Sequence, residues 1–275
     1  MSSQFIFLIM SILQAIILGI VQGLTEFLPV SSSGHLVLAN YYFGWSFPVP
    51  IEVDIITNTG TLLAVLISLR HDIYRAAVGF FKGLVSKQAR KEDDWHLAIL
   101  VILGSIPTAI IGLLLKPYFE SLNTPFYVSI ALIVTGLILW FAPKTANKSK
   151  IKDISFKDAL LGGIAQGLAV IPGISRSGST ITAMLWRDIN PELAARFSFL
   201  MYLVVSLGVT IMSASDLKEA ELGLGVLFAM FLASFITGFL ALKLLFYILK
   251  KGQFKIFAPY LWLVATITLI KLLLF

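Results

Sequence analysis

Long apolar stretches separated by short polar connections dominate the chain, and they predict a bundle of helices. Several are close to the length of about 20 residues that an α-helix needs to cross a bilayer. They cover Phe5–Val30, Ile55–Leu69, His96–Leu115, Pro125–Phe141, Ala159–Trp186, Leu193–Met212, Leu222–Leu249 and Ile256–Phe275. The pattern therefore predicts an all-α polytopic membrane protein.

Two of these stretches are interrupted by residues that end helices. Pro29 and the serines and glycine that follow it stop the first stretch, and a second, short helix is expected over His35–Tyr42. A turn-rich break is expected at Ser46–Pro50. The second interrupted stretch, Ala159–Trp186, has a proline, glycines and serines near its middle. Non-helical backbone at membrane depth is tolerated only where it lines a protein cavity.

The charges of the connections predict which ends lie together. Lys and Arg gather in Arg70–Trp95, Lys144–Lys157 and Lys250–Lys255, whereas Ser213–Glu221 is net acidic. Basic connections are retained on the cytoplasmic side of a membrane. Within the first of them, Ile73–Val85 has the pattern of an amphipathic interfacial helix.

This assignment requires both interrupted stretches to return to the side from which they enter. The chain passes from the inside loop at Lys144–Lys157 to the outside loop at Ser213–Glu221, and Leu193–Met212 provides one crossing. Ala159–Trp186 must therefore be re-entrant, and by analogy the first stretch is too, which leaves six spanning helices. The alternative is that both interrupted stretches are plain spanning helices.

The two interrupted stretches are also related in sequence, because they align without a gap at an offset of 144 residues. The identical pairs are Gly19/Gly163, Ile20/Ile164, Gln22/Gln166, Gly23/Gly167, Leu24/Leu168, Ser31/Ser175, Ser33/Ser177 and Gly34/Gly178. We interpret residues 1–275 as one membrane domain, with repeat 1 over about 1–142, repeat 2 over about 158–275 and a basic loop, 143–157, between them. The opposite orientations make this an inverted-topology repeat with a site near the midplane.

Composition agrees with a membrane protein and narrows the chemistry. Hydrophobic residues make up 58% of the chain and charged residues only 13%. There is no cysteine, which removes disulfide and thiolate chemistry. The net charge of +6 lies mainly in loops beside apolar helices, so we expect no nucleic-acid partner. No cleavable signal sequence is expected at the N-terminus, which lacks a basic region.

The aligned stretches differ where chemistry is expected. In the alignment, three positions of the first stretch that carry chemical groups have different residues in the second. The aligned pairs are Glu26/Val170, Ser32/Arg176 and His35/Ser179. The first copy therefore supplies an acid and an imidazole, and the second supplies the cation. An asymmetric site at the interface of the two copies follows from this difference.

The first stretch carries candidates for acid–base and nucleophilic chemistry. Gln22 and Glu26 are four residues apart and share a helix face, where the carboxylate can hold a divalent cation or accept a proton. A hydroxyl among Ser31–Ser33 needs a neighbouring base to act as a nucleophile, and Glu26 or His35 could serve. Interhelical hydrogen bonding by Gln22 and helix capping by Ser31 and Ser33 are the structural alternatives.

The second stretch carries candidates for anion binding. Arg176 offers a planar fork of donors suited to phosphate, and it lies between Ser175 and Ser177. Backbone N–H groups at a helix start also favour phosphate oxygens. Ser179 and Thr180 could bind phosphate or cap the helix, and an ion pair between Arg176 and Glu26 is the structural alternative. Together the two stretches indicate phosphoryl chemistry on a lipid phosphate that enters from the bilayer.

At these residues the chain resembles the bacterial undecaprenyl-diphosphate phosphatases, the bacitracin-resistance family. The family pattern is a Glu/Gln-xxx-Glu element, a Pro-Val-Ser-Ser loop ending in Gly-His, and Pro-Gly-x-Ser-Arg-Ser-x-x-Thr. Here these elements cover Gln22–Glu26, Pro29–His35 and Pro172–Thr180, and the similar layout of apolar segments extends over essentially the whole chain.

The resemblance implies a hydrolase that removes the terminal phosphate of undecaprenyl diphosphate and returns undecaprenyl phosphate to cell-wall synthesis, conferring bacitracin resistance. It implies Ser32 as nucleophile, Glu26 as its activator or a metal ligand, His35 in proton transfer and Arg176 in charge stabilisation. Whether Ser32 forms a covalent intermediate or orients water stays open. The substrate-binding residues that it implies are Ser31, Ser33, Gly34, Ser175, Ser177, Gly178 and Thr180.

The resemblance also implies a divalent cation, Mg2+ or Ca2+, a location in the bacterial cytoplasmic membrane and a site that opens to the outer face. A homodimer is compatible with it. Gln22 replaces a carboxylate found at its position in other members, which makes it a weak metal ligand. The alternative function is a transporter or flippase of a lipid-linked phosphate, because inverted repeats with broken helices are also a transporter architecture.

Overall fold

The computed structural model is almost entirely helical, as predicted, and describes residues 10–144, 148, 150–213 and 222–274 except for 46–50. The breaks predicted at Ser46–Pro50 and most of Ser213–Glu221 lie outside the described residues. The helices are α1 (Ile12–Phe27), α2 (Ser32–Phe43), α3 (Ile51–Ser68), α4 (Arg70–Val85), α5 (Asp93–Leu115), α6 (Phe119–Leu122), α7 (Pro125–Trp140), α8 (Phe156–Leu168), α9 (Arg176–Trp186), α10 (Pro191–Met212), α11 (Leu224–Lys250) and α12 (Phe257–Leu274).

Each interrupted stretch folds into a helix–loop–helix hairpin. In the first, Leu28 adopts an extended conformation (φ −63°, ψ 144°) because the residue before a proline is disfavoured in a helix, and α1 ends there. The second helix begins at Ser32 rather than at the expected His35, since Ser31 already acts as its N-cap. In the second hairpin α8 ends at Leu168 and α9 begins at Arg176.

The two ends of the second hairpin lie together. Two backbone hydrogen bonds join Lys148 to the chain just after α9. The Lys148 N–H donates to the Asp188 carbonyl (2.9 Å), and the Asn190 N–H donates to the Lys148 carbonyl (2.8 Å). Asp158, in the first turn of α8, accepts from Arg187 at 2.6 Å. A segment whose start and end meet in this way has the geometry that a re-entrant hairpin requires.

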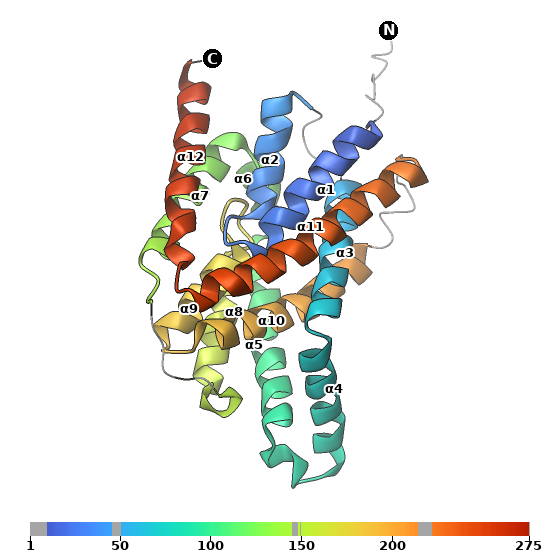
Figure 1. The fold of residues 1–275 in the computed structure, drawn as a ribbon, viewed down its shortest axis with the longest axis vertical. Coiled ribbons are helices and arrows are strands. Elements are labelled where there is room, and N and C mark those ends of the chain that lie inside the picture. Colours follow the sequence, from blue (N-terminus) through green and yellow to red (C-terminus); the bar gives the residue numbers. More distant parts are fainter. Residues whose placement is uncertain (1–9, 46–50, 145–147, 149, 214–221, 275) are drawn as a thin grey trace.

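Helices from the two halves of the chain pack against each other in pairs. The first helix of each half lies against a helix of the other half, α1 along α11 and α8 along α5. The last helices of the halves, α7 and α12, pack on each other, and α3 contacts α10. In Figure 1 the α1–α2 hairpin descends from the top and α8 rises from the bottom, so that the two tips approach each other in the middle.

The described helices support a multi-pass membrane protein, although their lengths do not match six equal spans. Four segments are long and apolar enough to cross a membrane: Asp93–Tyr118, Pro191–Met212, Leu224–Lys250 and Phe254–Leu274. The predicted span at Ile55–Leu69 qualifies only together with α4, from which it is bent by 78°. The predicted span at Pro125–Phe141 is the shorter apolar helix α7.

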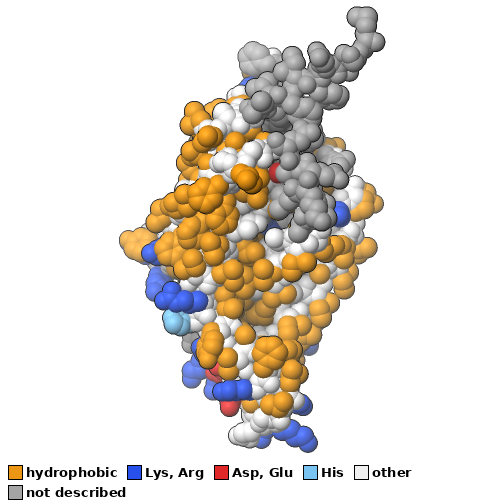
Figure 2. Space-filling model, turned by 90° about the vertical axis from the view of Figure 1, so that its right-hand side faces the viewer, with side chains coloured by type: hydrophobic (Ala, Val, Ile, Leu, Met, Phe, Trp, Pro, Cys, Tyr) orange, Lys and Arg blue, Asp and Glu red, His pale blue; other side chains and the backbone are white. Residues whose placement is uncertain are grey.

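The helix predicted at Ile73–Val85 is present as α4 and packs along α5. Arg75 pairs with Asp94 of α5 at 2.6 Å, and Phe80 stacks on Trp95 with ring centroids 5.8 Å apart. Figure 2 shows apolar side chains over the middle and upper part of one face, with Lys and Arg gathered towards its lower, narrower end. This distribution agrees with basic connections that share one end of the molecule.

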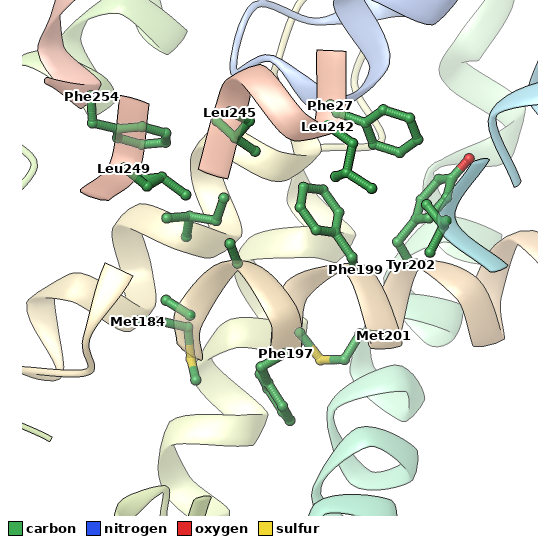
Figure 3. Close-up of a cluster of buried hydrophobic side chains, with 14 of the residues drawn as sticks. Phe27, Met184, Phe197, Phe199, Met201, Tyr202, Leu242, Leu245, Leu249 and Phe254 are labelled. Carbon is green, nitrogen blue, oxygen red and sulfur yellow. The ribbon is translucent and has the colours of Figure 1, made fainter. Parts of the chain in front are cut away.

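The main core is made of leucine, alanine, valine and isoleucine side chains together with aromatic rings and two methionines. Phe27 of α1, Phe199 of α10 and Leu242 of α11 are buried within it (Figure 3). Phe27 meets Phe199 edge to face, with ring centroids 5.5 Å apart. Glu26 precedes Phe27 on α1, so burial of this ring fixes the helix end that carries the predicted carboxylate.

Close packing of α8 on α5 depends on Gly163. A Cβ atom at this position would lie 1.9 Å from the Gly104 carbonyl oxygen. We expect Gly163→Ala to force the two helices apart and to destabilise the protein by about 1–3 kcal/mol. Thermal unfolding in detergent should show a lower melting temperature.

Gly208→Ala on α10 is the matched control, because a Cβ there meets no atom within 4 Å. Alanine is favoured over glycine inside a helix by roughly 0.5–1 kcal/mol, so this variant should be as stable as the parent or slightly more so. Equal melting temperatures for the two variants would show that the α5–α8 contact is looser than described.

Candidate active site

The Glu26 carboxylate is the centre of a polar cluster where the two hairpin tips meet. Ser32 donates to its Oε2 at 2.5 Å and Gln22 donates to the same oxygen at 2.9 Å. Arg176, 150 residues away along the chain, donates to its Oε1 at 2.7 Å. The structure therefore unites four predicted site residues, three from the first hairpin and the arginine from the second.

Burial makes this ion pair strong. The Glu26 side chain is 2% exposed, whereas that of Arg176 is 32% exposed. The carboxylate is thus withdrawn from solvent and depends on its three donors, while part of the guanidinium stays open. Arg176 can bind a second anion through this open part.

Sequence reasoning missed the support that α3 gives to the cluster. Gln22 donates to Oδ1 of Asn58 at 3.1 Å as well as to Glu26, so its amide N–H groups rather than its carbonyl oxygen face these partners. In this arrangement Gln22 is a hydrogen-bond donor and not a metal ligand. Asp54 lies one turn before Asn58, and its backbone carbonyl accepts from the Asn58 amide at 2.8 Å. Polar residues spaced by four in an apolar helix were the available signal.

The two serine loops make the same capping hydrogen bonds, although Ser31 (φ +70°) and Ser175 (φ −78°) differ in backbone conformation. Ser31 caps α2 by accepting from the Gly34 N–H at 3.4 Å, and its Oγ lies 3.4 Å from that of Ser33. In the second loop Ser175 accepts from the Gly178 N–H at 3.1 Å, and its Oγ lies 3.2 Å from that of Ser177. Capping, the structural alternative for Ser31, is therefore confirmed, whereas the cap of α9 is Ser175 and neither Ser179 nor Thr180.

The loops also carry local conformations that fix their tips. Ser31 has φ +70°, a region that non-glycine residues seldom adopt, and this turn presents the adjacent Ser32 to Glu26. In the second loop Thr135 of α7 donates to the Gly173 carbonyl (2.8 Å) and accepts from the Ser175 N–H (3.2 Å). A residue of the first half therefore holds the loop of the second half.

Helices α2 and α9 both begin at the junction of the tips. A Cβ at Gly34 in the first turn of α2 would lie 3.0 Å from the Gly173 Cα, so the two loops are in direct backbone contact. Helix starts present free N–H groups and partial positive charge. Two of them beside Arg176 form a region suited to a group that carries several negative charges.

His35 has partners other than the nucleophile candidate. Its Nδ1 is 2.8 Å from the Ser31 carbonyl oxygen, and its Nε2 is 2.8 Å from the hydroxyl of Tyr260 on α12, whose ring it stacks on. Ser32 donates to the Glu26 carboxylate, so Glu26 is the one of the two predicted bases that lies beside Ser32. Tyr260 was not predicted from the sequence.

The remaining predicted residues differ in exposure. Ser33 is exposed at the start of α2, whereas Ser177 is buried and donates to the Leu28 carbonyl at 3.4 Å. Ser179 and Thr180 are buried in α9, and their hydroxyls have no hydrogen-bond partner among the residues that the structure describes. Buried hydroxyls are usually paired, so these two are available to a ligand near the start of α9.

An aromatic floor underlies the ion pair. The Arg176 guanidinium lies over the ring of Tyr202, 5.1 Å from its centroid, and Tyr202 meets Phe27 edge to face at 6.3 Å. Glu26, Arg176 and Tyr202 line one shared cavity with Phe27, Gln166, Ser177, Ser198 and Phe199. This cavity has room for roughly a single water molecule. The acid and the cation therefore open into one compartment.

The donor set can be compared with the needs of a divalent cation. Among the described residues, no group of three His, Asp or Glu side chains could hold a metal ion by itself. Mg2+ is commonly bound by one or two carboxylates together with substrate phosphates. The described residues therefore form no closed protein cage, and a cation at this site would need phosphate oxygens among its ligands.

Comparisons with known proteins give one consistent result. The family model described as bacitracin resistance protein BacA matches residues 15–267. An undecaprenyl-diphosphatase of Acaryochloris marina is 65% identical over 262 residues, which are 95% of this chain and 98% of that protein. Undecaprenyl-diphosphatase of Desulforapulum autotrophicum is 43% identical over 272 residues, and undecaprenyl-diphosphatase 2 of Bacillus thuringiensis is 38% identical over 266, each with the same coverage.

Proposed function

The chain belongs to the bacitracin resistance protein BacA family, and on that premise we propose how its residues carry out the reaction. It is an integral-membrane hydrolase that removes the terminal phosphate of undecaprenyl diphosphate. The product, undecaprenyl phosphate, is recycled as a carrier lipid for cell-wall synthesis, and the activity confers bacitracin resistance. The observation that carries the mechanism is the contact of Ser32 and Arg176 with one carboxylate, that of Glu26.

In the proposed reaction Ser32 is the nucleophile. Its Oγ attacks the terminal phosphorus, and its proton passes to Glu26, which already accepts its hydrogen bond. The bond between the terminal phosphorus and the bridging oxygen breaks, and undecaprenyl phosphate leaves. Glu26 gives this proton to the departing undecaprenyl phosphate and is a carboxylate again. Water then attacks the phosphoserine, its proton passes through Glu26 to the Ser32 Oγ as the bond between Oγ and phosphorus breaks, and inorganic phosphate is released.

Arg176 stabilises the charge that develops on the phosphoryl oxygens. Its guanidinium is fixed by Glu26 on one side and by the Tyr202 ring below, which leaves its exposed part for the phosphate. A doubly charged phosphate is a stronger partner than one carboxylate, so the guanidinium can turn to the substrate without leaving the site.

The diphosphate binds between the two serine loops in this proposal. The N–H groups at the starts of α2 and α9 face the junction, and the free hydroxyls of Ser179 and Thr180 lie one turn into α9. The other residues that we assign to binding are Ser31, Ser33, Gly34, Ser175, Ser177 and Gly178.

His35 supports the nucleophile through the backbone. Its Nδ1 holds the carbonyl of Ser31, the residue whose unusual conformation presents Ser32. A direct role of His35 in proton transfer requires its Nε2 to exchange the Tyr260 hydroxyl for a water or a substrate oxygen.

A divalent cation, Mg2+ or Ca2+, would be held by Glu26 and Asp54 together with the substrate phosphates. Bound there, it supplies a Lewis acid that neutralises charge on the phosphoryl oxygens. Asp54 lies on α3 and Glu26 on α1. These two helices are joined by the hydrogen bond from Gln22 to Asn58, and each contributes one carboxylate.

We further propose six crossings and two re-entrant hairpins in the bacterial cytoplasmic membrane, with the site opening to the outer face. α3 and α7 supply the two crossings that are short, and the exchanged packing of α1 on α11 and α8 on α5 supports two inverted repeats. Short spans are accommodated by local bilayer thinning.

The test is phosphate release from undecaprenyl diphosphate by the purified protein in detergent, with and without a chelator of divalent cations. Release that depends on the cation supports the mechanism. Binding of the diphosphate without release would instead favour a transporter of lipid-linked phosphate.

Tyr202 provides a separate prediction. Replacing the ring by Tyr202→Leu removes the cation–π contact below Arg176, and we expect kcat to fall about tenfold because such a contact contributes up to about 2 kcal/mol when desolvated. Tyr202→Phe keeps the ring and should retain activity within about twofold. Equal losses in both variants would assign the effect to the Tyr202 hydroxyl, which lies 3.3 Å from that of Thr61.

A further inference from the structure

A basic cleft separate from the active-site cavity lies where the start of α10 and the end of α11 meet the chain that follows α7. Its volume is about 470 Å³, within the range of small-molecule sites. Three lysines line it, Lys144, Lys250 and Lys251, together with Glu192 and the backbone around Gly252. None of these residues takes part in the proposed reaction.

The cleft has a net positive charge, because its one carboxylate, Glu192, is already paired with basic side chains. Glu192 pairs with Arg196 at 3.0 Å and more loosely with Lys250 at 3.7 Å. Lys251 lies over the ring of Tyr247, 4.4 Å from its centroid, and Lys144 is exposed. These two lysines have no carboxylate within salt-bridge distance among the described residues, so their charges are available to an anion.

Exposed aromatic side chains place the cleft at the level of the lipid headgroups. Phe141 and Trp186 are 66% and 57% exposed, and the Trp186 indole donates to the Phe141 carbonyl at 3.2 Å. Tyr247, below Lys251, is 55% exposed. Trp and Tyr gather where a membrane protein passes from hydrocarbon to headgroups, and lysines extend to the phosphates there.

We propose that this cleft binds the headgroup of an anionic phospholipid from the surrounding leaflet. The phosphate and glycerol would lie between Lys144 and Lys251, and the acyl chains would lie along the apolar surface of α11. Basic pockets between membrane helices on the side of the basic loops are suited to such headgroups. The site is independent of the hairpin tips, so it does not depend on the proposed reaction.

The experiment measures binding of phosphatidylglycerol and of phosphatidylcholine to the purified protein in detergent by native mass spectrometry. The parent protein should prefer phosphatidylglycerol. The double variant Lys144→Gln/Lys251→Gln should bind it about 30-fold more weakly, from roughly fivefold for each lysine near a lipid phosphate. Lys87→Gln/Lys91→Gln is the control, because it removes the same charge from two exposed lysines outside the cleft and should bind as the parent does.

Two outcomes would overturn the proposal. One is equal weakening in both double variants, which would show attraction to net charge without a site. The other is displacement of the lipid by inorganic phosphate at millimolar concentration, which would show a site for free anions.

A further measurement needs no variant. The preference of the parent for phosphatidylglycerol should shrink at 0.5 M salt, since exposed charges are then screened. A preference that is unchanged by salt would also contradict it.

Discussion

Ser32→Ala should abolish phosphate release from undecaprenyl diphosphate, with kcat lowered at least about a thousandfold, as expected when a nucleophile is removed. The hydroxyl is the one group of the first loop that contacts the Glu26 carboxylate, and alanine offers no atom to attack phosphorus. Substrate binding should persist, because Arg176 and both helix starts remain. The measurement is phosphate release under single-turnover conditions together with binding of the radiolabelled lipid.

A second serine provides the control for this loss. Ser129 on α7 is also buried, and its hydroxyl donates to the Pro125 carbonyl within its own helix at 2.7 Å. Ser129→Ala should keep full activity. Retention of more than a tenth of the parent rate by Ser32→Ala would exclude Ser32 as the nucleophile and would favour a water activated directly by Glu26.

Arg176→Ala should lower both activity and stability. The rate should fall about a thousandfold or more, the magnitude associated with an arginine that stabilises phosphoryl transfer. The change also leaves Glu26 buried without a cation. Breaking a buried pair costs about 3–5 kcal/mol, and we expect about 2 kcal/mol because the guanidinium is partly exposed. Phosphate release and thermal unfolding in detergent measure the two effects.

The double variant Arg176→Ala/Glu26→Gln separates these effects. A neutral amide in place of the carboxylate should recover most of the lost melting temperature and none of the activity. Arg75→Ala is the control for losing an ion pair, because Arg75 and Asp94 form an equally close pair that is largely exposed and far from the tips. It should change stability by less than about 1 kcal/mol and leave activity intact. Recovery of activity in the double variant would show that Arg176 acts only as the counter-ion of Glu26.

These results would also test why the site is divided between the hairpins. Glu26 and Ser32 come from one hairpin and Arg176 from the other, so any separation of the tips breaks the cluster. Thr135 and Gly173 tie the second tip to the first half of the chain in the same way. The proposed catalytic groups are thus brought together by the packing of the two halves and by no single segment.

The sequence by itself determined the class of the protein and the candidate site residues. Apolar stretches of membrane length, breaks at Pro29 and Pro172 and the 144-residue offset are local properties that can be read along the chain. Glu26, Ser32 and Arg176 were found in this way because charged and hydroxyl groups are costly in apolar segments. The cap at Ser31 was also visible as an alternative, since capping depends on residues three positions apart, whereas the cap at Ser175 was not predicted.

Only the tertiary structure decided which of these groups meet. It placed Ser32 on Glu26 and turned His35 towards Tyr260, 225 residues away, a choice that spacing in the first loop could not make. It added Asn58 and Tyr202, whose roles come from helices that pack beside α1 and under Arg176. The physical reason is that helix formation depends on neighbours within about four residues, whereas side-chain partners are set by how distant helices cross.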